Sequence, residues 1–185
     1  MTAATEAVAA PRLRAALWAL GAVASFTAMA VAGREAGASL DTFEIMTYRS
    51  LLGIVHVLAV ARALGTLGEV RTDRLGLHAA RNLFHFAGQN LWFFALTAIP
   101  LAQVAAFEFS YPVWVALAAP LVLGERLTAR RAIAIAIGFA GILVILRPGA
   151  APLDAGTLAA LLCAFGFAGS ALATKRLTRD QSVTC

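Results

Sequence analysis

Six long apolar segments restrict the fold of this chain more than any other feature of its sequence. They cover residues 16–32, 45–61, 79–98, 101–123, 132–146 and 156–174. Most are close to the ~20 residues that a helix needs to cross about 30 Å of hydrocarbon. The segments are continuous rather than alternating in polarity, which excludes a barrel of strands. The sequence therefore predicts an all-α fold, a polytopic membrane helix bundle of about six transmembrane helices.

Lysine and arginine gather in every second connection between these segments. Only Arg34 and Arg147 lie on one side of the predicted bundle. The other side carries Arg12, Arg14, Arg62, Arg71, Arg74, Arg81, Arg126, Arg130, Arg131, Lys175, Arg176 and Arg179. Because basic loops stay in the cytoplasm, we expect a multi-pass protein of the bacterial inner (cell) membrane, with residues 1–14 as a cytoplasmic N-terminal arm. The net charge of +5 then reflects topology, so the expected partner is the lipid bilayer and not nucleic acid.

A faint internal repeat relates the first and the last apolar segment. Residues 17–34 align with residues 158–175, with Leu20 opposite Leu161 and Arg34 opposite Lys175. The second copy comes five helices after the first, an odd number, so it crosses the membrane in the opposite direction. Inverted repeats are typical of transporters that work by alternating access.

Three motifs lie at the ends of the predicted spans: Pro100-Leu101-Ala102-Gln103, Leu123-Gly124-Glu125-Arg126-Leu127-Thr128, and the stretch from Gly138 to Arg147-Pro148-Gly149. Together they resemble the EamA family of the drug/metabolite transporter superfamily, whose members typically have ten helices in two inverted five-helix repeats. The resemblance implies one complete repeat over residues 15–147 and the incomplete start of a second over residues 148–185. On this expectation the chain is truncated at its C-terminus.

The resemblance implies a transporter that exports a small metabolite or an amphipathic compound by alternating access. No enzyme motif is present, and neither a cofactor nor a metal site is expected. The alternative is a truncated fragment or pseudogene product that does not transport and only interacts with the membrane. A stripe of small residues, Ala134, Gly138 and Gly141, suits close helix packing or a homodimer.

Glu108 is the only acidic residue well inside a predicted span. Such groups usually face a cavity or a partner because burying a charge in lipid is costly. Arg49 lies at a similar depth in the second span and is a candidate ion-pair partner. Pro112, four residues after Glu108, removes a helix hydrogen bond and predicts a helix break there. The pattern indicates a proton-coupling or cation-binding carboxylate, with a permanent structural ion pair as the alternative.

The third span carries a polar stripe. Asn82, His85 and Gln89 stand at positions i, i+3 and i+7 of one helix face. They either line an aqueous substrate path or form hydrogen bonds between helices, and the sequence does not favour one over the other. The further residues proposed for the substrate or proton path are Asn90, Gln103, Tyr111 and Trp114.

Overall fold

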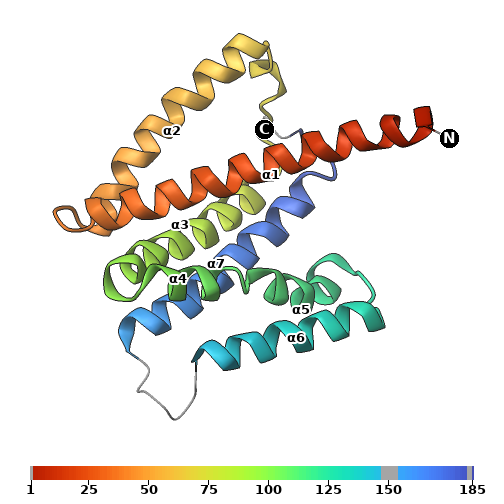
Figure 1. The fold of residues 1–185 in the computed structure, drawn as a ribbon. Helices are drawn as coiled ribbons and strands as arrows, with labels where there is room; N and C mark the ends of the chain where they lie inside the picture. The colour runs from red at the N-terminus through yellow and green to blue at the C-terminus, as the bar shows by residue number, and fades with distance from the viewer. Residues whose placement is uncertain (1, 147–153, 183–184) are drawn as a thin grey trace.

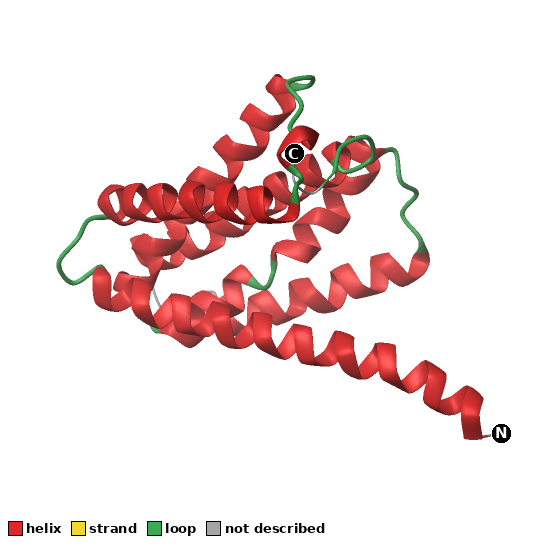
Figure 2. Cartoon of the chain, turned by 90° about the horizontal axis from the view of Figure 1, so that it is seen from above, coloured by secondary structure: helices red, strands yellow, loops and turns green. Residues whose placement is uncertain are grey.

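The computed structural model describes residues 2–146, 154–182 and 185, and this part of the chain consists of helices and their connections without any strand (Figures 1 and 2). The helices are α1 (Thr2–Ala36), α2 (Thr42–Leu64), the short 3-10 helix η1 (Leu67–Glu69), α3 (Leu75–Ala98), α4 (Leu101–Glu108), α5 (Tyr111–Leu123), α6 (Ala129–Leu146) and α7 (Ala155–Leu177). The predicted all-α fold is confirmed.

Four stretches of the described chain are by themselves long and apolar enough to cross a membrane. They are Leu13–Ala36, Thr42–Leu64, Leu101–Leu123 and Ala155–Leu177. The other two expected spans, α3 and α6, are helical but are not among the four. In α3 the polar residues from Arg81 to Asn90 lower the hydropathy. The arrangement agrees with a polytopic membrane helix bundle.

Short polar sequences fix where α2 and α7 begin. The carboxylate of Asp41 accepts hydrogen bonds from the backbone N–H groups of Phe43 and Glu44, and the carboxylate of Glu44 accepts one from the backbone N–H of Asp41. This capping box satisfies N–H groups that have no partner inside the helix. Asp154 caps α7 in a similar way by accepting from the backbone N–H of Thr157 at 2.6 Å, and this bond lowers the pKa of the Asp154 carboxyl.

Helices α3 and α7 form the centre of the bundle and cross in close contact (Figure 1). Their backbones meet at two glycines: a Cβ added to Gly166 would lie 2.7 Å from the Cα of Gly88. The main core lies beside this crossing, where Trp92 and Leu96 of α3 meet Val104 and Phe107 of α4. Side chains of α1 from Leu13 onward and of α2 are mostly exposed, as expected for helices whose outer surface faces lipid or other helices.

The fourth expected span is not one continuous helix. It ends as α4 at Glu108 and starts again as α5 at Tyr111, with Pro112 in the first turn of α5. Pro112 has no N–H to donate to the carbonyl of Glu108, so the helical ladder is interrupted at this point. The break lies beside a buried carboxylate in the interior of the bundle, and Glu108 itself is only 6% exposed.

Candidate functional site: a cavity at the helix break

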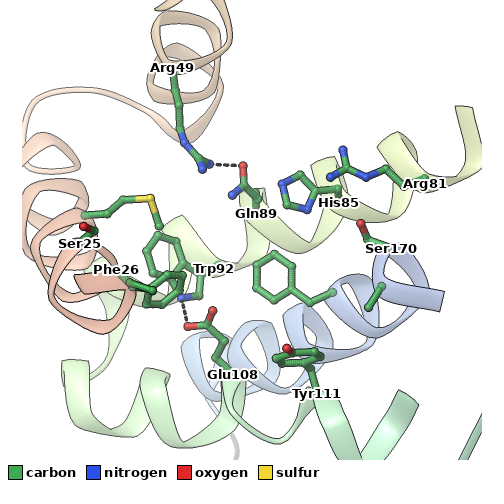
Figure 3. A pocket seen from close by; sticks show the side chains of 14 residues that line it. Ser25, Phe26, Arg49, Arg81, His85, Gln89, Trp92, Glu108, Tyr111 and Ser170 are labelled. Carbon is green, nitrogen blue, oxygen red and sulfur yellow. Dashed lines mark hydrogen bonds between the residues drawn. The ribbon is translucent and has the colours of Figure 1, made fainter. Parts of the chain in front are cut away.

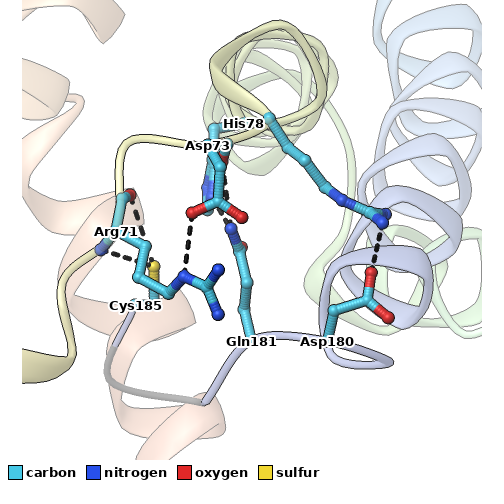
Figure 4. A network of polar contacts seen from close by, with 7 residues as sticks. Arg71, Asp73, His78, Asp180, Gln181 and Cys185 are labelled. Carbon is cyan, nitrogen blue, oxygen red and sulfur yellow. Dashed lines mark hydrogen bonds and ion pairs between the residues drawn. The ribbon is translucent and has the colours of Figure 1, made fainter.

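A cavity of about 510 Å³ lies between α1, α2, α3 and α7, next to the break between α4 and α5 (Figure 3). Its volume is within the ~300–1,000 Å³ that is usual for small-molecule sites. We call it the central cavity, and it is lined by Ala22, Ser25, Phe26, Met29, Arg49, Arg81, His85, Gln89, Trp92, Glu108, Tyr111, Phe167, Ser170 and Ala171. It therefore collects side chains from segments that are far apart in the sequence.

One face of α3 forms the polar wall of this cavity. Arg81, His85, Gln89 and Trp92 follow one another at intervals of three or four residues, which places them on the same side of the helix. The stripe predicted from the sequence started at Asn82, but Asn82 is exposed and accepts a hydrogen bond from Arg81 Nη1 at 3.0 Å. The first residue of the polar stripe is therefore Arg81 and not Asn82, whereas His85 and Gln89 line the cavity.

Arg49 reaches across from α2 to α3. Its Nη1 donates a hydrogen bond to Oε1 of Gln89 (Figure 3). The amide oxygen of Gln89 is therefore occupied, and the amide keeps two N–H donors for another partner. The sequence suggested an ion pair between Arg49 and Glu108, but among the described residues no ion pair joins these two groups. Arg49 and Glu108 lie at similar depths in the predicted spans, but Arg49 is on α2 and its side chain points to α3, where it contacts Gln89.

Glu108 has a different partner, the indole of Trp92. The Trp92 Nε1–H donates to Oε2 of Glu108 at 2.7 Å, and the tryptophan is only 1% exposed. Among the described residues no group donates to the other carboxylate oxygen, Oε1. The carboxylate is thus held at the cavity wall by one oxygen, and the second oxygen can accept a hydrogen bond or a proton.

Aromatic rings complete the cavity. The rings of Phe26 and Trp92 lie 5.7 Å apart between their centroids, and those of His85 and Phe167 lie 5.9 Å apart. Tyr111 enters from the first turn of α5. Flat rings on several walls, combined with a few polar groups, are suited to a planar organic molecule.

Five of the candidate residues from the sequence line the central cavity: Arg49, His85, Gln89, Glu108 and Tyr111. Asn90 lies outside it and donates to the backbone carbonyl of Phe86 at 2.9 Å. Gln103 is half-buried on α4 and is not part of the lining.

Trp114 also lies outside the central cavity. It packs on Phe165, with ring centroids 4.1 Å apart, and donates to the Ser110 hydroxyl at 3.2 Å. The place in the substrate or proton path that the sequence suggested for Trp114 is therefore not in this cavity.

Sequence reasoning missed the contributions of α1 and α7 to the cavity. Ser25, Phe26 and Met29 come from α1, and Phe167 and Ser170 come from α7. Arg81 was interpreted as a topology signal only. Its position four residues before His85, on the same helix face, could have indicated a role in the cavity.

Residues 13–147 match the model of the EamA-like transporter family. The chain is 32% identical to a riboflavin transporter of Brucella anthropi over 164 residues, which cover 88% of this chain and 57% of the relative. It is 28% identical to a riboflavin transporter of Vibrio cholerae over 173 residues, or 92% and 58% of the two chains.

A further relative is an S-adenosylmethionine uptake transporter of Rickettsia conorii, with 26% identity over 166 residues, or 90% of this chain and 56% of the relative. The chain thus spans little more than half the length of these relatives. No solved structure matches it. The apolar helices, the family match and these relatives agree with the resemblance seen in the sequence motifs, and the chain belongs to the EamA-like transporter family of multi-pass membrane proteins.

Proposed function

We propose that the chain forms the substrate-binding part of a transporter in the bacterial inner membrane, with its N-terminus and basic loops in the cytoplasm. The observation that carries the proposal is the central cavity, which joins a broken helix, a buried carboxylate and the crossing of α3 with α7. Broken helices beside polar groups are typical substrate sites in transporters with repeats. Alternating access would expose this cavity to one side of the membrane at a time.

The substrate we propose is a planar nitrogen heterocycle with a polar side chain. Support comes from the rings of Phe26, Trp92 and Phe167 around the cavity. The names of the relatives point to the same chemistry, because riboflavin and S-adenosylmethionine both contain a fused nitrogen heterocycle. Hydroxyl groups of Ser25 and Ser170 and the free amide N–H groups of Gln89 are suited to a hydroxylated chain.

Charge favours a riboflavin-like substrate over S-adenosylmethionine. In the described part of the chain, Arg49 and Arg81 line the cavity together with a single carboxylate, that of Glu108. S-Adenosylmethionine carries a sulfonium cation, which two guanidinium groups would repel, whereas riboflavin is uncharged at neutral pH. We therefore propose riboflavin as the test ligand.

We further propose that Glu108 couples transport to protons. Glu108 lines the cavity in which a substrate would bind, and no described residue donates to its Oε1, so substrate and proton would compete for this oxygen. If substrate and proton cannot occupy Glu108 together, each must leave before the other binds, which is antiport. Protons that flow into the cell would then drive export of the substrate, the direction expected from the sequence. The Rickettsia conorii relative has uptake in its name, which favours cotransport instead. Arg49, Arg81, His85 and Tyr111 are the other charged or titratable groups around the same cavity.

Riboflavin binding to the purified chain in lipid nanodiscs tests the substrate. Gln89→Leu should weaken binding about tenfold because it removes the hydrogen-bond donors. Asn90→Leu is the matched control, since Asn90 is next in sequence but lies outside the cavity, and it should bind as the wild type does. Equal binding by both variants, or tighter binding of S-adenosylmethionine than of riboflavin, would contradict the proposed substrate.

The pH dependence of the same binding tests the coupling. Acidification should weaken binding in the wild type and leave it unchanged in Glu108→Gln. Binding that strengthens on acidification would indicate cotransport and uptake. A pH dependence that survives in Glu108→Gln would assign the titration to His85 rather than to Glu108.

A further inference from the structure

A second hollow, which we call the apolar groove, runs along the outside of α7 between α3 and α5. It has a volume of about 560 Å³ and is lined by Phe84 of α3, Trp114 and Leu121 of α5, and Phe165, Leu172 and Arg176 of α7, among other residues. Among the described residues that line it, Arg176 is the only charged one. The groove shares no residue with the central cavity.

We propose that the apolar groove binds one acyl chain of an anionic phospholipid, whose phosphate pairs with Arg176. The dimensions fit this occupant. Phe165 and Arg176 are 11 residues apart on one helix, which corresponds to about 16 Å along its axis. One leaflet contributes about 15 Å of hydrocarbon. The groove therefore extends from the middle of the bilayer to its surface, at the depth of one acyl chain.

The side chains of the groove are accessible from the lipid. Leu121 is 90% exposed, and Phe84 and Phe165 are 49% and 45% exposed, while Leu172 at the base is 5% exposed. Small residues keep the groove open between these large ones: a Cβ added to Gly169 would lie 2.7 Å from the ring of Phe84. The large residues thus form walls around a narrow apolar floor, a shape that is complementary to a hydrocarbon chain.

Charge indicates an anionic headgroup. Arg176 is in the last turn of α7, and no described acidic group forms an ion pair with it. Its neighbour Lys175 is already paired with Glu125, and Arg179 donates to the Leu123 carbonyl at 3.4 Å. Arg176 therefore keeps a guanidinium group for a phosphate at the membrane surface, where basic pockets between helices are suited to acidic lipids.

Native mass spectrometry of the detergent-purified chain tests the proposal with phosphatidylglycerol and phosphatidylcholine of identical acyl chains. We expect one phosphatidylglycerol to bind with a preference of about five- to tenfold over phosphatidylcholine. Arg176→Gln should abolish this preference. Arg130→Gln, which removes an exposed arginine outside the groove, is the matched control and should retain it.

A second variant tests the acyl chain separately. Ala80→Phe places a ring in the groove and should lower the binding of both lipids. Equal preference in Arg176→Gln and Arg130→Gln, or no preference in the wild type, would overturn the proposal, as would lipid binding unchanged by Ala80→Phe. None of these measurements depends on riboflavin. Lipid binding can therefore fail while the proposed transport function holds, and the proposed transport function can fail while lipid binding holds.

Discussion

The indole N–H of Trp92 donates to the carboxylate of Glu108 across the interface between α3 and the end of α4, with an N···O distance of 2.7 Å. Both residues are almost completely buried. The bond therefore connects α3 with the end of α4 at the wall of the central cavity.

Trp92→Phe keeps most of the ring and removes this donor. We expect the variant to lose about 1–3 kcal/mol of stability, because a buried acceptor loses its partner. Thermal unfolding in detergent measures the loss. Trp114→Phe is the control, since its indole forms a longer bond of 3.2 Å at a less buried position. If Trp92→Phe lowers the stability of a Glu108→Leu variant as much as it lowers that of the wild type, the hydrogen bond is not the cause of the loss.

Gly166→Ala should destabilise the protein by about 1–3 kcal/mol, as overpacking of a close contact does. The added methyl group would lie 2.7 Å from the Cα of Gly88 and 2.8 Å from its nitrogen, and backbone atoms cannot move aside as a flexible side chain can. Gly53→Ala on α2 is the matched control, since nothing lies within 4 Å of its added Cβ, and it should be neutral or stabilising. Equal stability of the two variants would contradict the close crossing of α3 and α7.

Glu125 joins the ends of three helices near the basic side. Hydrogen bonds from Lys175 Nζ at 2.5 Å and Arg131 Nη1 at 2.6 Å lower the pKa of the Glu125 carboxyl below its usual 4.5. Because the folded-state pKa is the lower one, these bonds stabilise the fold above pH 4.5, and their contribution is lost as the pH falls through the folded-state pKa.

The Tm of the wild type should therefore exceed that of Glu125→Gln at neutral pH, and the difference should shrink on acidification below pH 4.5. The effect is small because exposed ion pairs contribute little. A difference for Glu125→Gln that stays constant with pH would exclude the carboxylate as its source.

The proposed orientation can be tested with single cysteines in a background in which Cys163 and Cys185 are replaced. Ser39, between α1 and α2, and Thr72, between η1 and α3, are both exposed and lie in connections expected on opposite sides of the membrane. A thiol reagent that does not cross the membrane should label Ser39→Cys in intact cells and spare Thr72→Cys until the cells are opened. The reverse result would invert the orientation.

Much of the helical architecture can be derived from the sequence. Continuous apolar segments identify helices because lipid leaves no other partner for the backbone groups. The position of Pro112 after Glu108 predicts an interruption, and the chain changes from α4 to α5 between these residues. The division into a complete first repeat and the start of a second, and the homodimer, stay predictions.

Residue pairing in the site could not be derived in this way. Counting along each span gives the depth of a residue but not the rotation of its helix about its own axis. Arg49 and Glu108 have similar depths, yet Arg49 contacts Gln89 and Glu108 contacts Trp92. For the same reason the sequence assigns Asn82 to the polar stripe, although Arg81 lines the cavity. It also assigns Trp114 to the substrate path, although Trp114 lines the apolar groove.

The contact of Gly88 with Gly166 has a mechanical consequence. Helices usually interlock through ridges of side chains, and those ridges must separate before the helices can change their angle. Gly88 and Gly166 have no side chains between them, so the two backbones come into direct contact, and α3 and α7 also meet on both sides of this position, with Phe84 against Gly169 and Ala98 against Gly156. Because the contact continues along both helices, α3 and α7 cannot tilt against each other without separating these residues. A movement that opens the central cavity should therefore displace α1, α2 or α4 relative to a fixed pair of α3 and α7.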